Sequence, residues 1–244
     1  TPTNRIPIST SEVSYRGLKN LGATCYMNSI LQVLFHLPLF RKYIFNIRVG
    51  DTEEDHNILL HLQRIFAMMQ LSHYSVSTKN LARSFGWSNI ETMMQQDVYE
   101  FCSVFLEKID ITIQKIPQNK KFSISSLFKG KYISTIRCRH VNFQTQTTNV
   151  INVCTLDVRG VSSLEESFLS FTSVEPLDGS NKYDTGTYGL QDADMFSKFT
   201  ELPQILMLHL KRFDIDMETQ QNSKIDSYFS FSKNIDLRKY LADQ

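Results

Sequence analysis

The segment GLKNLGATCYMNSILQVLF, residues Gly17–Phe35, decides how the rest of the chain is interpreted. Its polar, glycine-bearing start gives way at Cys25 to a long apolar run. Thr24 is typical of a helix N-cap, and Pro38 would break a helix. The segment therefore predicts a helix over 25–37 with a cysteine in its first turn, either as a small core residue or as a reactive thiol.

The surroundings of Cys25 favour chemistry. The thiolate is the nucleophilic form of cysteine, and the N–H groups and dipole of a helix N-terminus stabilise the anion. The preceding turn supplies Gly17 and Gly22, which let the backbone approach a substrate, and Asn20, whose amide can donate to a developing oxyanion. The alternative is that Cys25 only packs, because free cysteine is among the most buried residue types.

Length and composition limit the class of protein. The chain has 244 residues, 41% hydrophobic and 21% charged, which predicts one large or two small globular domains. The 26 basic and 25 acidic residues leave a net charge of +1, so no general attraction to nucleic acid or membranes is expected. No apolar run is long enough to cross a bilayer, and the N-terminus has no secretory h-region. We therefore expect a cytoplasmic or nuclear protein.

The cysteines do not form a metal-binding pattern. They stand at Cys25, Cys102, Cys138 and Cys154, and none belongs to a C-x-x-C pair. Cys138 and His140 are two residues apart but have no second ligand pair, so ordinary strand sequence is the simpler interpretation. We expect neither a metal nor a cofactor.

The first half of the chain is predicted to be helical. A helix beginning near Asp55 has five apolar residues on one face: Ile58, Leu62, Ile65, Phe66 and Met69. A third helix covers residues 88–109 and has eight more at helical spacing: Ile90, Met93, Met94, Val98, Phe101, Cys102, Phe105 and Ile109. Asp97 falls on this apolar face or at its edge, where a carboxylate needs a partner.

After about residue 123 the chain is rich in β-branched residues. KYISTIRC and TNVINVCTLDV are predicted strands, and QILMLHLKRF, residues 204–213, is predicted to be a strand covered on both faces. Ser163 and Glu166 form a capping box that opens a short helix through Phe171. Residues 175–191 are rich in Gly, Asp and Asn and predict a turn region. Helices followed by strands predict an α+β fold.

The sequence resembles the ubiquitin-specific proteases, the papain-like deubiquitinases, over most of its length. Gly17–Phe35 resembles the cysteine box of this family, and two later segments resemble further family blocks: MQQDVYEF, residues 94–101, and LPQILMLHLKRF, residues 202–213. Three more segments resemble one branch of the family: SFGW, LFKGK and EPLDGSNKYDTGTYGLQDA. These segments match in the same order from about Tyr15 to the last residues, so the resemblance does not rest on one short motif.

The resemblance implies a domain layout. Residues 1–14 form a tail, and residues 15–244 form most of a papain-like catalytic domain of the ubiquitin-specific protease type. Its helical thumb covers about 15–122, and its β-rich palm and fingers cover about 123–244. Many relatives hold zinc in the fingers, but here only Cys138 stands near that region, so a metal-free domain is expected.

The resemblance also implies site residues and partners. Cys25 is the nucleophile and Asn20 the oxyanion donor, while Gln95 and Asp97 line the channel for the ubiquitin tail and Tyr183 helps to cover that tail. For Asp97 the alternative is a helix N-cap or a salt bridge within the domain. The expected partners are ubiquitin and ubiquitinated proteins.

The general base of this family has no counterpart in the sequence. It is a histidine in a Gly-Gly-His-Tyr-like block, and none of the six histidines has that context: His36, His56, His61, His73, His140 and His209. We expect the block to follow beyond residue 244 in a truncated chain, with natural loss of that segment as the alternative. The expected activity is that of a deubiquitinase that hydrolyses the isopeptide bond after the C-terminal glycine of ubiquitin. The first alternative is a ubiquitin-binding pseudoenzyme, and the second is a papain-like protease for another substrate or a ubiquitin-like modifier.

Overall fold

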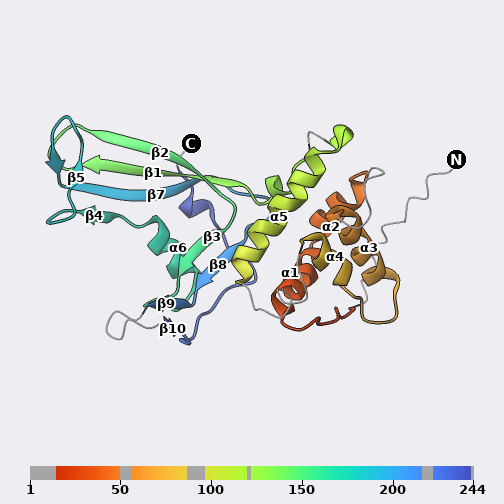
Figure 1. The fold of residues 1–244 in the computed structure, drawn as a ribbon. Helices are drawn as coiled ribbons and strands as arrows, with labels where there is room; N and C mark the ends of the chain where they lie inside the picture. The colour runs from red at the N-terminus through yellow and green to blue at the C-terminus, as the bar shows by residue number, and fades with distance from the viewer. Residues whose placement is uncertain (1–14, 50–56, 87–96, 120–121, 216–221, 243–244) are drawn as a thin grey trace. The chain divides into compact units, whose positions relative to one another are not determined.

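The computed structural model describes residues 15–49, 57–86, 97–119, 122–215 and 222–242 (Figure 1). The chain divides into two compact units, Thr1–Ser125 and Ser126–Gln244, called unit 1 and unit 2 below. Within the described ranges unit 1 is helical and the strands belong to unit 2. None of the helices described is long and apolar enough to cross a membrane.

Unit 1 contains five α-helices among its described residues: α1 (Cys25–His36), α2 (Pro38–Asn46), α3 (Ile58–Leu71), α4 (Lys79–Ser84) and α5 (Val98–Gln114). A short 3-10 helix, η3 (Pro117–Asn119), follows. The first predicted helix is confirmed and ends at His36. Pro38, expected only to break it, opens α2 instead, because a first-turn proline has no N–H to lose and its fixed φ suits the helix.

The core of unit 1 is built from the apolar faces of these helices. The five residues predicted on one face of α3 are all buried. On α1, Phe35 packs edge-on against Phe66 of α3, with ring centroids 5.4 Å apart. Tyr26, the neighbour of Cys25, packs edge-on against Phe101 of α5 at 5.3 Å. Aromatic contacts of this kind hold the start of α1 against α5.

The start of α5 differs from the prediction. The helix begins at Val98, and Asp97 is its N-cap: Oδ1 accepts from the N–H groups of Tyr99 at 2.7 Å and Glu100 at 3.1 Å. Asp97 is exposed, so a place on the apolar face is wrong, whereas the N-cap role given as the alternative is confirmed. Val98, also predicted on the apolar face, is 45% exposed. The earlier part of the predicted helix, with Gln95, lies outside the described residues.

Unit 2 contains a four-stranded antiparallel sheet in the order β2-β1-β7-β4. Its strands are β1 (Gly130–Cys138), β2 (Gln144–Ile151), β7 (Ala193–Glu201) and β4 (Glu175–Leu177). Long runs of β1, β2 and β7 lie side by side (Figure 1). The predicted strand KYISTIRC lies within β1, where its β-branched residues fit the half-buried pleat.

A second pairing in unit 2 is parallel and joins β3 (Cys154–Asp157) to β8 (Leu208–Lys211). The predicted strand over 148–158 is therefore two elements, because the chain leaves β2 at Ile151 and turns to pair with β8. Only four residues of the predicted strand 204–213 are extended in β8, and its described side chains are half-buried or exposed. The short strands β9 (Phe213–Ile215) and β10 (Asn222–Lys224) pair next to it.

Helix α6 (Leu164–Thr172) closes the core of unit 2 and begins at the predicted cap. Ser163 accepts from the N–H of Glu166 at 3.3 Å, as expected. Glu166 accepts from the N–H of Ser162 at 2.7 Å, and this bond is the main cause that lowers the pKa of Glu166. Phe168 then stacks on Tyr240 of the short 3-10 helix η5 (Arg238–Tyr240), with ring centroids 5.2 Å apart. A further 3-10 helix, η4 (Ser125–Leu127), spans the boundary between the two units in the sequence.

Candidate functional site

Cys25 is the exposed cysteine of the described chain. Cys102, Cys138 and Cys154 are buried, with 1%, 6% and 0% of their surface accessible. Burial raises the pKa of Cys102 to about 11 and that of Cys154 to about 12. These two thiols therefore stay protonated and inert at neutral pH. The interpretation of Cys25 as a core residue is wrong, and its catalytic role stays a prediction.

Thr24 occupies the N-cap position of α1, as predicted, but its hydroxyl does not cap the helix. Thr24 Oγ1 instead accepts from the N–H of Leu21 and donates to Asn20 Oδ1, both at 3.1 Å. The first-turn N–H groups of α1 are therefore not occupied by the threonine that normally caps them. An anion beside Cys25 is the kind of ligand that such donors bind.

Asn20 lies in the turn before the helix and is exposed. Its Oδ1 receives the Thr24 hydroxyl and also the N–H of Gly22, the latter at 3.3 Å. These two donors fix the amide oxygen inside the turn, which leaves Nδ2 as the end that can donate outward. Gly22 has φ of 128°, a conformation that residues with a Cβ rarely adopt, so the turn depends on this glycine.

The turn is anchored on both sides by backbone hydrogen bonds that the sequence analysis missed. Lys19 N–H donates to Val76 O at 2.8 Å, and Val76 N–H donates to Gly17 O at 2.9 Å. From α1, Asn28 Nδ2 donates to Lys19 O at 3.2 Å. An added Cβ at Gly17 would meet nothing within 4 Å, so glycine is not needed there for packing. No local pattern points to Val76, because its bridge to the turn joins residues far apart in the sequence.

The described histidines of unit 1 do not form a nucleophile–base pair with Cys25. His36 ends the 12-residue helix that Cys25 begins, about 16 Å away by helical rise. Its ring contacts the rings of Tyr15 and Phe35 instead. His61 is buried in α3, and none of the described histidines in this unit hydrogen-bonds with Cys25. The base expected for this chemistry is therefore not supplied by these side chains.

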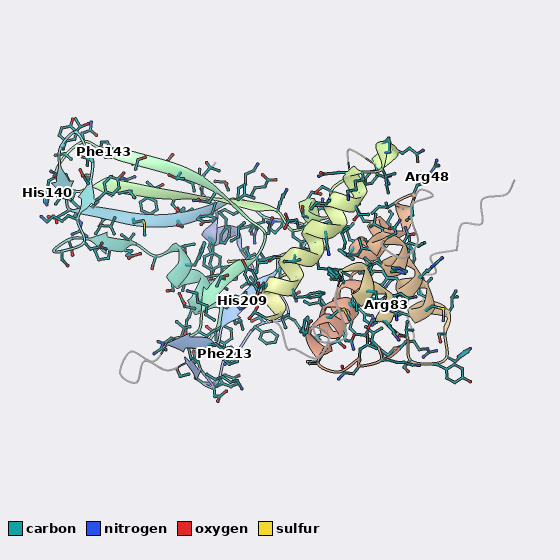
Figure 2. The ribbon with its side chains drawn as sticks, viewed as in Figure 1. Arg48, Arg83, His140, Phe143, His209 and Phe213 are labelled. Carbon is teal, nitrogen blue, oxygen red and sulfur yellow. The ribbon has the colours of Figure 1, made fainter. Side chains whose placement is uncertain are left out.

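Tyr183 lies in unit 2, inside the region predicted as turns. It belongs to β5 (Tyr183–Asp184), which pairs with β6 (Leu190–Gln191) in a short hairpin. The ring of Phe143 is 6.2 Å from that of Tyr183 and 6.4 Å from that of Tyr188. Phe143 and His140 lie at the same end of the sheet, where β1 turns into β2 (Figure 2). The role of Tyr183 towards a ubiquitin tail stays a prediction.

Ion pairs stabilise the same end of the sheet. Arg139 contacts Asp178 at 3.0 Å and Asp194 at 2.6 Å. His140 is exposed, whereas the neighbouring Cys138 is buried. Within the described ranges no group of three or more His, Cys, Asp or Glu side chains could hold a metal ion.

The contrast between Cys25 and the buried thiols gives a simple prediction. A short treatment of the native protein with iodoacetamide at pH 8 is expected to alkylate Cys25 before any other cysteine, because the thiolate must be accessible to react. Peptide mass mapping after quenching identifies the labelled residue. Labelling of Cys102 or Cys154 at a similar rate in the folded protein would contradict the burial described above.

The comparisons with known proteins agree with this geometry. The family model described as "Ubiquitin carboxyl-terminal hydrolase" matches residues 16–244. Ubiquitin carboxyl-terminal hydrolase 7 of Caenorhabditis briggsae is 40% identical over 91% of this chain, and that of Drosophila melanogaster is 37% identical over 96%. Ubiquitin C-terminal hydrolase 12 of Arabidopsis thaliana is 38% identical over 96%. The segments SFGW, LFKGK and EPLDGSNKYDTGTYGLQDA predicted the branch of the herpesvirus-associated ubiquitin-specific protease, and the similarity to hydrolase 7 confirms this prediction.

Solved structures show the same mixed α+β fold. A chain in the SAGA Ubp8/Sgf11/Sus1/Sgf73 DUB module bound to ubiquitin aldehyde matches 93% of this chain with a TM-score of 0.81 and 26% identity. A chain in a SAGA DUB module bound to monoubiquitin matches 93% with a TM-score of 0.82 and 25% identity.

The present chain covers only part of these proteins. It spans 19% and 21% of the first two relatives named above and about half, 53% and 54%, of the two solved chains. The family model nevertheless matches nearly all of the present chain. The chain therefore belongs to the ubiquitin carboxyl-terminal hydrolase family.

Proposed function

We propose that the protein is a thiol-dependent deubiquitinase that hydrolyses the isopeptide bond after the C-terminal glycine of ubiquitin, with Cys25 as nucleophile. One observation carries the proposal: Cys25 is exposed at the start of α1, directly after a turn that holds the Asn20 amide by its oxygen. This arrangement suits attack on a carbonyl whose oxygen becomes negative.

The proposed reaction proceeds in two steps. Cys25 Sγ forms a bond to the glycine carbonyl carbon, and the resulting oxyanion accepts from Asn20 Nδ2 and the first-turn N–H groups of α1. The C–N bond then breaks, and the lysine amine leaves with a proton, so that a thioester remains. Water hydrolyses the thioester and restores the thiol. The proton transfers need a general base, which the resemblance assigns to a histidine in a Gly-Gly-His-Tyr-like block.

We also propose that Asp97, Gln95 and Tyr183 contact ubiquitin. Two observations support this role for Asp97. Its side chain is exposed, and both backbone N–H groups that it caps donate to Oδ1 and not to Oδ2. An exposed carboxylate oxygen can accept from an arginine or from backbone N–H groups of an extended tail. Two relatives of known structure are described as bound to ubiquitin or its aldehyde, which supports this choice of partner.

A thiol-dependent mechanism suits a protein that works in a reducing compartment. Four cysteines are present in free form, and a thiol hydrolase needs its nucleophile reduced. We therefore propose a cytoplasmic or nuclear enzyme that acts on ubiquitinated proteins.

The deciding experiment is intact-mass analysis after incubation with ubiquitin that carries a thiol-reactive C-terminal group. We expect one ubiquitin adduct on the unmodified chain and none on the Cys25→Ala variant. Absence of an adduct on a chain that still binds ubiquitin would contradict the enzyme and favour the ubiquitin-binding module. Absence of both adduct and binding would contradict the proposal as a whole.

A further inference from the structure

We propose that Thr24 is a positioning residue that sets which end of the Asn20 amide faces the reacting carbonyl. The inference rests on the proposed function, because it assigns a role within the same site. Its basis is the hydrogen-bond chain from Leu21 N–H to Thr24 Oγ1 and on to Asn20 Oδ1, with both distances at 3.1 Å.

The direction of this chain follows from its fixed donor. Leu21 N–H can only donate, so it occupies an acceptor site of the Thr24 hydroxyl. The hydroxyl proton then points to Asn20 Oδ1, and the two bonds strengthen each other. Thr24 has 0% of its surface exposed, so water does not compete for its hydroxyl.

A second donor makes the orientation of Asn20 unique. Gly22 N–H also donates to Asn20 Oδ1, at 3.3 Å. If the amide rotated by half a turn, Nδ2 would face the Gly22 N–H, and two donors would oppose each other. Thr24 and Gly22 together therefore hold the oxygen inward and the NH₂ group outward.

Because the Thr24 hydroxyl bonds within the turn, it does not cap the helix. An N-cap threonine usually accepts from an N–H group of the first helical turn, and Thr24 does not. Its φ of −88° and ψ of 20° lie outside the extended region that a capping residue typically adopts. The same hydroxyl position therefore keeps the Asn20 NH₂ group facing outward, where it could stabilise an oxyanion.

The test compares two ubiquitin reagents on the unmodified protein and its variants. Ubiquitin aldehyde adds to a thiol and places an oxygen where the oxyanion forms. Ubiquitin with a C-terminal alkyl bromide reacts by displacement: the S–C bond forms, bromide leaves, and no oxyanion develops. Loss of the donor orientation should therefore weaken the first reaction and leave the second unchanged.

We expect Thr24→Val, which keeps the shape and removes the hydroxyl, to lower kcat for a ubiquitin C-terminal amide about 10-fold with KM within about 2-fold. Binding of ubiquitin aldehyde should weaken by a similar factor, while the alkylation rate stays within about 2-fold. Thr24→Ser should restore kcat. Thr112→Val is the matched control, because the Thr112 hydroxyl donates to Lys108 O within α5 at 2.8 Å and should leave all three values unchanged.

A double-mutant cycle separates positioning from general damage to the fold. In an Asn20→Ala background, Thr24→Val should have no further effect on kcat, because the group that it positions is gone. An equal loss in the aldehyde and alkylation reactions, or a full additional loss in the Asn20→Ala background, would overturn the positioning role. If the unmodified protein does not form the alkyl adduct at Cys25, the proposed function itself is wrong, and the role of Thr24 with it.

Discussion

Replacing Cys25 with alanine is expected to lower hydrolysis of a ubiquitin C-terminal amide by about 10⁴-fold or more, because no other described thiol is accessible to form the thioester. The free energy of unfolding should change by only about 0.5 kcal/mol or less, since an exposed side chain has little packing to lose. The affinity for ubiquitin should also persist. Steady-state kinetics, urea unfolding and calorimetric titration with ubiquitin measure the three quantities.

Cys102→Ala is the matched control and should show the opposite pattern. Cys102 is 1% exposed on α5, and removing its sulfur leaves a small cavity that costs about 1 kcal/mol or more. Its raised pKa, about 11, already keeps this thiol out of nucleophilic chemistry, so activity should persist. A stability loss in Cys25→Ala would contradict its exposed position. A loss of activity in a folded Cys102→Ala protein would contradict the role of Cys102 as a core residue without catalytic function.

The parts of the fold that the sequence predicted correctly depend on local physics. The periodic apolar residues of α3 are buried as expected, because a helix that packs on one side repeats its core contacts every three to four residues. The Ser163 cap of α6 was also predictable, since the side chain of an N-cap bonds within its own turn.

The errors have a common physical cause, which is information that lies outside the local pattern. Asp97 satisfies the helical period of the residues around it, yet its side chain can also accept two N–H groups, so that the helix starts after it. The predicted strand over 148–158 is divided because its second half pairs with β8, more than 50 residues later in the chain. Apolar composition alone does not report such a partner.

The candidate site was likewise predictable from the sequence only in part. The sequence places Cys25 at the start of a helix and Asn20 in the turn, and the structure confirms both positions. The rotamer of Thr24 was not predictable, because a threonine at the N-cap is compatible with a hydroxyl that caps the helix or one that turns away. The hydrogen bonds to Asn20 decide between these states, and only the structure shows them.

A buried carboxylate near the end of unit 1 is expected to matter most for stability. Asp110 lies on α5 and is 8% exposed, and its two oxygens accept from Ile124 N–H at 2.6 Å, the Ser123 hydroxyl at 2.9 Å and Ser125 N–H at 3.2 Å. Asp110→Ala should lower the free energy of unfolding of unit 1 by about 3 kcal/mol, because it leaves buried donors unpaired. The urea midpoint of the helical circular-dichroism signal measures this loss.

Two further variants test the reason for that loss. Asp110→Asn keeps the size but turns an NH₂ group towards a fixed N–H donor, so it should lie between the unmodified protein and Asp110→Ala. Asp226→Ala makes the same change at an exposed carboxylate paired with Lys224 at 3.0 Å, and it should cost about 0.5 kcal/mol or less. If Asp110→Ala were as mild as Asp226→Ala, water would have to replace the lost acceptor. The segment 123–125 would then be held by its own apolar burial, with Ile124 at 1% exposure as the anchor, and not by the carboxylate.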